Sequence, residues 1–239
     1  MLFRSMIISG ALALTPSPSF GQSGSPALAN SDVYMNNQLD ELRYELNFRK
    51  NPGSATEAYR SASRFASCVV RFDDRRSAAV LAADAGSVQE TAAFGALTRR
   101  YGACINGSEG VPSLLLRGAL AEALWVRRGA VANPSKRTSV DMSEIESFFK
   151  TSPRAELASK VGTLPIGWVS RCQVMALPTL SAAVLKAPPG STEERTAAAA
   201  LYAKSEVCGV KELGNAIVPY TRASLADALY QDVVRSTKG

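Results

Sequence analysis

Four cysteines are the first residues whose spacing could carry chemistry. Cys68 and Cys104 are 36 residues apart, and so are Cys172 and Cys208. Thiols of an exported protein pair as disulfides, and four of them allow three connectivities. A zinc site is the alternative, but cysteine zinc sites use close pairs such as Cys-x2-Cys, and the sequence has none. The cysteines therefore predict a structural framework.

Two arginines and two acids form a second repeated set. Arg117 and Arg222 lie in apolar helical stretches, each five positions before an acid, Glu122 and Asp227. A buried arginine needs a salt bridge or carbonyl hydrogen bonds within the protein, or else a ligand carboxylate or phosphate. Five positions are about 140° around a helix, so neither arginine pairs with the acid of its own helix. The two acids could serve as a hydrolytic acid/base pair only if the fold made them face each other.

The first half of the chain is the more basic one. Four of its arginine positions hold uncharged residues in the second half: Met175, Thr179, Leu180 and Ala203. The arginines that make it more basic are Arg71, Arg75, Arg76, Arg99, Arg100, Arg127 and Arg128. Such a cluster is either a solvated face or a site for an anionic partner. We expect any ligand contacts at Arg75, Arg76, Arg99 and Arg100, or at the repeated pair Arg117 and Arg222.

The sequence contains no histidine, which removes Ser-His-Asp and Cys-His catalysis and imidazole metal sites. Carboxylate-pair, Ser-Lys and tyrosine chemistry stay open. The glycine-containing stretch 106–110 matches neither a phosphate-binding loop nor a dinucleotide fingerprint. Tyr101, Trp168 and Tyr202 fit core positions better than a ligand cage. We therefore expect no metal, no cofactor and no catalytic residue.

Composition bounds the class of protein. The 239 residues are 46% hydrophobic and 7% aromatic, which is enough for a packed core of Ala, Leu and Val. The net charge of +6 favours anionic neighbours such as membrane or envelope surfaces. The sequence shows no base-stacking or helix-turn-helix signature, so we expect no nucleic-acid partner.

The chain is similar to itself at a fixed offset. A shift of 104 positions aligns residues 63–104 with 167–208, and 15 of the 42 aligned residues are identical. One residue later, residues 117–125 match 222–230. Self-similarity of this kind predicts a tandem duplication, and a unit that duplicates carries its own bridge. We therefore predict the disulfides Cys68–Cys104 and Cys172–Cys208, each worth about 3–4 kcal/mol of stability.

Helical periodicity predicts four helices in each repeat, and strand-like alternation is absent from the sequence. Asp73 or Asp74 should cap the second helix of the first repeat. Ser87 with Glu90, and the corresponding Ser191 with Glu194, read as capping boxes that open the third helices. In each repeat the bridge should tie the first helix to the end of the third.

The remaining segments complete the predicted organisation. A basic start, an apolar run over 6–14 and small residues before Gln22 predict a cleavable signal peptide over 1–21, cut near Gly21. Residues 22–54 should form a flexible leader with a helix over 33–50, ended by 51–54. Residues 130–161 should be a linker with short helices, the first opened by Ser143. The repeats would then occupy 55–129 and 162–239.

Each half has one ordered set of motifs. A cysteine with valine two residues on is followed by Ser-Ala-Ala-Val-Leu, a Gly-Ser-x-x-Glu box, a second cysteine, and Arg-x-x-Leu-Ala-(Glu/Asp)-Ala-Leu-(Trp/Tyr). This arrangement, over roughly 55–130 and 162–235, resembles uncharacterised secreted helical proteins of alphaproteobacteria. The resemblance implies a helical fold and an exported location, and it carries over no activity.

We therefore expect an exported, all-α protein of the periplasm or the secreted fraction, made of two disulfide-stapled four-helix repeats. No segment after the signal peptide is apolar over enough residues to cross a membrane. The leading functional hypothesis is a non-catalytic protein that binds an envelope protein or an anionic surface through its first repeat. The alternatives are binding of a small anionic ligand between the repeats, near Arg117 or Arg222, and a carboxylate hydrolase using Glu122 or Asp227.

Overall fold

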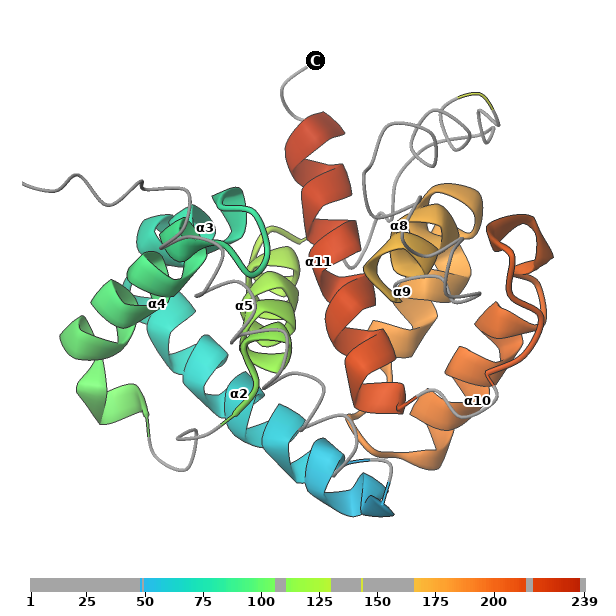
Figure 1. Ribbon diagram of the computed structural model, residues 1–239, viewed down its shortest axis with the longest axis horizontal. Coiled ribbons are helices and arrows are strands. Elements are labelled where there is room, and N and C mark those ends of the chain that lie inside the picture. Colours follow the sequence, from blue (N-terminus) through green and yellow to red (C-terminus); the bar gives the residue numbers. More distant parts are fainter. Residues whose placement is uncertain are drawn as a thin grey trace, which may run out of the picture.

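The computed structural model describes residues 48, 50–105, 111–129, 143, 166–213 and 217–236, and every regular element within these residues is helical (Figure 1). The helices of the first half are α2 (Pro52–Phe72), α3 (Asp74–Ala82), α4 (Val88–Arg100) and α5 (Ser113–Arg127). Those of the second half are α8 (Ile166–Ala176), α9 (Pro178–Lys186), α10 (Thr192–Tyr202) and α11 (Val218–Ser236). The all-α prediction is confirmed for the described residues.

Several predicted segments lie outside the described residues. They are the signal peptide over 1–21, nearly all of the leader and helix over 22–50, the loop over 106–110, and the linker over 130–161 apart from the helical Ser143. None of the described helices has the length and apolar content that a bilayer crossing requires.

Asn51 is not helical and follows the helical Phe48 and Lys50, so the chain breaks within 51–54 as predicted. The next helix begins earlier than the predicted start of the repeat at residue 55, because Pro52, Gly53 and Ser54 form the first turn of α2. Proline suits this position because its fixed φ is helical and its missing N–H would have no partner there. The Ser54 hydroxyl donates to the Asn51 carbonyl at 2.7 Å, which adds a contact at this helix start.

The predicted caps are present, with one change in geometry. Asp73 accepts a hydrogen bond from the Arg76 backbone N–H at 3.0 Å and so caps α3. Ser87 accepts from the Glu90 N–H at 3.1 Å, but the Glu90 carboxylate reaches the N–H of Gly86, one residue before the cap. Gly86 has a φ of 79°, a conformation that favours glycine. This turn leaves the second Glu90 oxygen free for another partner.

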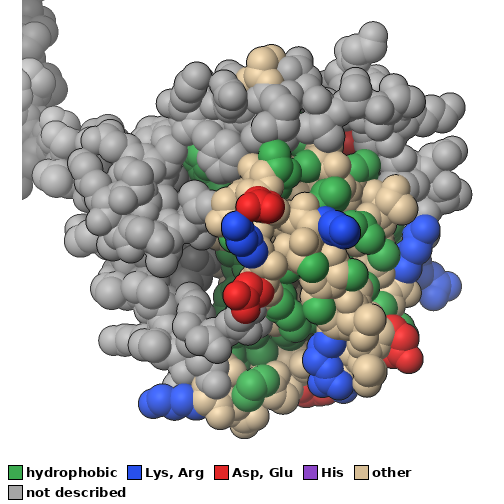
Figure 2. Space-filling model, turned by 90° about the vertical axis from the view of Figure 1, so that its right-hand side faces the viewer, with side chains coloured by type: hydrophobic (Ala, Val, Ile, Leu, Met, Phe, Trp, Pro, Cys, Tyr) green, Lys and Arg blue, Asp and Glu red, His purple; other side chains and the backbone are tan. Residues whose placement is uncertain are grey.

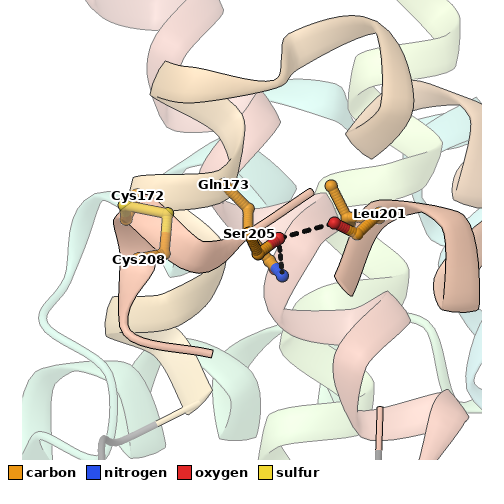
Figure 3. The surroundings of a disulfide bond; sticks show 5 residues. All are labelled: Cys172, Gln173, Leu201, Ser205 and Cys208. Carbon is orange, nitrogen blue, oxygen red and sulfur yellow. Dashed lines mark hydrogen bonds between the residues drawn. A yellow bond between two sulfur atoms is a disulfide. The ribbon is translucent and has the colours of Figure 1, made fainter. Parts of the chain in front are cut away.

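Both predicted disulfides are present. Cys68 of α2 joins Cys104, and Cys172 of α8 joins Cys208. Each second cysteine lies in a 3₁₀ turn just after the third helix, η1 (Gly102–Cys104) or η2 (Glu206–Cys208). Beside Cys172 the buried Gln173 side chain donates to Ser205 at 2.9 Å, and Ser205 donates to the Leu201 carbonyl at 2.7 Å (Figure 3).

Helices α5 and α11 lie side by side at the centre of the molecule, with α3 and α4 on one flank and α8–α10 on the other (Figure 1). Helix α2 runs from the first flank across to the second half, where Arg60 donates to the Pro189 carbonyl at 2.9 Å. A side chain at Gly118 of α5 would overlap the backbone of Ala223 of α11, so the two helices touch where their sequences correspond. One hydrophobic core contains residues of both halves, including Trp125 and Leu225. The halves therefore pack on each other.

Candidate functional site

Arg117 and Arg222 are buried at this central contact, with side chains 5% and 2% exposed. Arg222 lies on α11 and pairs with Glu122 of α5 through Nε at 2.9 Å and Nη2 at 2.5 Å. Arg117 lies on α5 and pairs with Asp227 of α11 through Nε at 3.1 Å. Each arginine thus pairs with the acid of the other half.

The remaining contacts of the two guanidinium groups correspond one for one. Arg117 Nη1 contacts the Glu90 carboxylate at 2.8 Å, and Arg222 Nη1 contacts Glu194 at 3.0 Å. Arg117 also donates to the carbonyls of Val80, Leu81 and Ala83. Arg222 donates to those of Val184, Leu185 and Ala187, which lie 104 positions later.

These contacts use every guanidinium nitrogen of both residues. They are the salt bridges and carbonyl hydrogen bonds that form the structural interpretation of Arg117 and Arg222. Burial by itself lowers the pKa of Arg222, but the hydrogen bonds and charges of Glu122 and Glu194 outweigh it and hold that pKa above its ordinary value. Arg117 shows the same balance with Asp227 and Glu90, and its pKa is also raised. Both groups are therefore permanent cations inside the protein.

Glu90 and Glu194 are members of these networks that sequence reasoning assigned only to helix caps. The sequence feature that could have indicated this second role is the glycine directly before each Ser-x-x-Glu box. Because the turn at Gly86 or Gly190 receives one carboxylate oxygen, the other oxygen is left for the buried arginine. Each glutamate therefore joins a helix start to the central contact.

The candidate acids Glu122 and Asp227 lie in separate networks, each paired with its own arginine. Glu122 also accepts a hydrogen bond from the Tyr59 hydroxyl of α2 at 2.5 Å. Burial, followed by the charge of Glu122, raises the pKa of Tyr59 well above its ordinary value, so the phenol stays protonated. The arrangement gives both carboxylates an anchoring role between the two halves.

The seven arginines that the sequence singled out as the basic cluster of the first half are all exposed. They lie at the ends of α2, α4 and α5 and in the first turn of α3. We call this set the arginine surface: Arg71, Arg75, Arg76, Arg99, Arg100, Arg127 and Arg128.

Four members of the arginine surface have partners. Arg76 pairs with Asp73 at 2.5 Å, and Arg127 contacts Asp74 at 3.6 Å. Arg100 donates to the Tyr101 hydroxyl at 3.3 Å, and Arg128 lies over the Tyr230 ring, 5.1 Å from its centre. The other three, Arg71, Arg75 and Arg99, form no side-chain hydrogen bond or ion pair with the described residues.

An exposed aromatic pair accompanies the arginine surface, and sequence reasoning missed it. Phe72 is 67% exposed and stacks on Tyr101, with 6.2 Å between the ring centres. The Tyr101 hydroxyl donates a hydrogen bond to Asp73 at 3.0 Å. Tyr101 is only partly buried, which differs from the core position expected for it, whereas Trp168 and Tyr202 are buried as expected. The sequence feature that could have indicated this exposure is the position of Phe72, the last residue of α2, directly before the capping Asp73.

The corresponding side of the second half has a different charge pattern. Figure 2 looks onto that side and shows Lys and Arg side chains interspersed with Asp and Glu among apolar ones. Exposed residues here include Glu193 and Arg195 of α10, and Lys211 pairs with Glu206 at 2.7 Å. Within the described residues, the arginine surface therefore has an excess of positive charge that this side of the second half does not show.

Comparisons with known proteins add no further constraint: no family model, no curated protein and no solved structure matches this chain. Within the described residues, no group of three or more Cys, Asp or Glu side chains is placed to hold a metal ion.

Proposed function

We propose that this chain is a non-catalytic binding protein of the cell envelope, which holds an anionic partner on the arginine surface of its first half. The observation that carries the proposal is the position of Arg75. Arginines in the last turns of α2, α4 and α5 complement the negative helix ends, so stability alone explains them. Arg75 lies in the first turn of α3, where a positive charge is unfavourable, and none of the described residues pairs with it.

The aromatic pair supports the same proposal. Phe72 keeps two thirds of its surface exposed although an apolar core lies within reach of the same helix. An exposed aromatic group beside unpaired arginines combines an apolar contact with charge attraction, and this combination is common at binding surfaces.

The proposal includes an exported protein built by duplication. Two disulfides are typical of an oxidising compartment outside the cytoplasm. The matched contacts of Arg117 and Arg222, with carbonyl partners at a constant offset of 104, support descent of both halves from one unit.

The test measures binding to vesicles. The wild-type protein should sediment with vesicles containing about 30% phosphatidylglycerol and not with phosphatidylcholine alone, and the binding should weaken as salt rises. Replacing Arg75, Arg76, Arg99 and Arg100 by Ser should abolish it. A control variant replaces Arg195, Lys204 and Lys211 of the second half by Ser, and this variant should bind the vesicles as the wild type does.

Undiminished binding by the four-Ser variant would end the proposal for this surface. If neither vesicle binds, an acidic envelope protein is the remaining partner class, and crosslinking from position 75 in intact cells would identify it.

A further inference from the structure

A pocket of about 340 Å³ lies between α2 and α5, on the first half of the molecule. Its apolar wall consists of Val70, Ala119, Ala123 and Val126. Pockets for small molecules begin at about 300 Å³, so this one suits a compact ligand. It goes beyond the proposed function, which concerns a surface and a larger partner.

Glu122 is the acidic group of the pocket. Its side chain is 17% exposed, and Arg222 and Tyr59 fix its orientation from the interior side. The carboxylate receives three hydrogen bonds, whereas two carboxylate oxygens offer about four acceptor positions. One acceptor position is therefore left for a donor.

The charge around Glu122 favours a cationic donor. The network beneath the pocket contains one guanidinium, that of Arg222, and two carboxylates, those of Glu122 and Glu194. Within this inner network, negative charge therefore exceeds positive charge by one. An ammonium group at the pocket would neutralise this excess.

Basic groups line the same pocket. Arg127 is engaged with Asp74 and with the Val70 carbonyl, but Arg71 forms no side-chain hydrogen bond or ion pair with the described residues. The donors of the Arg71 guanidinium are therefore available to a ligand carboxylate at the same pocket that Glu122 lines.

We propose that this pocket binds a small aliphatic zwitterion of the free α-amino acid class. Glu122 accepts the ammonium, Arg71 holds the carboxylate, and the apolar wall covers the side chain. Hydroxyl groups of Ser63 and Ser67 complete the lining from α2.

The second half lacks these charges at the corresponding positions. Arg71 corresponds to Met175, and Arg127 corresponds to Asp232, so a carboxylate ligand would meet no cation at either place. The binding site is therefore expected once per chain.

The test is calorimetric titration at pH 7 with three probes: L-leucine, N-acetyl-L-leucine and L-leucinamide. L-leucine should bind with a Kd of about 1 mM or tighter. The acetylated probe lacks the ammonium and the amide lacks the carboxylate, so each should bind at least about tenfold more weakly, since each loses one ion pair.

Two variants with matched controls locate the site. Arg71→Met should weaken L-leucine binding at least about tenfold, whereas Arg75→Met, a change at an equally exposed arginine, should not. Glu122→Gln should weaken it as well, and Asp227→Asn, at the corresponding position of the other network, should not. If Glu122→Gln fails to fold, the Arg71 pair still decides the question.

Three results would overturn the proposal. They are no measurable L-leucine binding at 10 mM, equal binding of either blocked probe, and wild-type affinity in Arg71→Met. These outcomes are separate from the vesicle test, because the four-Ser variant keeps both Arg71 and Glu122.

Discussion

At the scale of single residues, the two buried arginines have a large desolvation cost and connect several helices through their contacts. Taking a guanidinium out of water is unfavourable, and the protein offsets this with two carboxylates and several carbonyls at Arg117 and again at Arg222. Breaking such a network lowers the free energy of unfolding strongly, because removal of one member leaves the other charged groups buried without a partner.

Arg222→Met should therefore lower the free energy of unfolding by about 3–5 kcal/mol, since it strands Glu122 and Glu194. Urea denaturation followed by far-UV circular dichroism measures this loss. Arg195→Met, on an exposed face of α10, is the control and should change stability by less than about 0.5 kcal/mol. Equal stability of the two variants would show that the network contributes nothing.

Asp73 gives a pH prediction. Hydrogen bonds from the Arg76 backbone and side chain lower its pKa from 3.8 to about 2. A lowered pKa stabilises the fold above pH 3.8, and this contribution is lost as the pH falls toward 2. Asp73→Asn keeps a capping side chain but not the charge, so its stability deficit should be largest above pH 4 and vanish near pH 2. Thermal melts between pH 2 and 6 would check this, and a deficit independent of pH would contradict it.

At the scale of elements, the caps and bridges could be predicted because they depend on short-range patterns. Asp73, Ser87 and Ser191 cap the helices for which their sequence positions marked them. The exchange of acids between α5 and α11 could not be predicted, because it depends on how two helices 100 residues apart cross. The sequence shows that Arg117 cannot pair with Glu122 on its own helix, but it does not show that Asp227 takes that place.

The crossing of α5 and α11 depends on Gly118. Gly118→Ala should destabilise the protein by about 1–3 kcal/mol, because the new methyl group meets the Ala223 backbone, which cannot move aside alone. Gly95→Ala is the control inside α4, where the nearest atom belongs to the flexible Arg99 side chain, and it should stabilise by up to about 1 kcal/mol. Chemical denaturation of both variants measures the difference, and a stabilised Gly118→Ala would refute the close contact.

Each disulfide closes a loop between two helices of its own half. Replacing Cys172 and Cys208 together by Ser should cost about 3–4 kcal/mol on the chain-entropy model, and the same change at Cys68 and Cys104 should cost a similar amount. Urea unfolding of the two double variants checks this, with non-reducing peptide mapping of the wild type as the control for pairing. Wild-type stability in both variants would show that the bridges constrain little.

At the scale of the whole molecule, the two halves share an element order but differ on their outer surfaces. The centre retains the same arginine contacts on both sides, whereas the arginine surface and the pocket belong to the first half. The helical class of both halves could be predicted from periodicity. The pocket could not, since it arises from small residues on two helices that approach only in the fold.

Under the duplication that we propose, the exchange of acids between α5 and α11 has a consequence for the history of the chain. A single ancestral unit would have supplied the arginine of its last helix with one glutamate and several carbonyls, but it would have lacked the crossed pair between that arginine and the acid of a second copy. Two identical copies would have satisfied both pairs at once, as in an isologous homodimer, with the helix contact at Gly118 and Ala223 near the symmetry axis. Fusion of the two copies into one polypeptide would have preserved that interface and removed the requirement for identical subunits, so that one half could acquire a binding surface while the other did not.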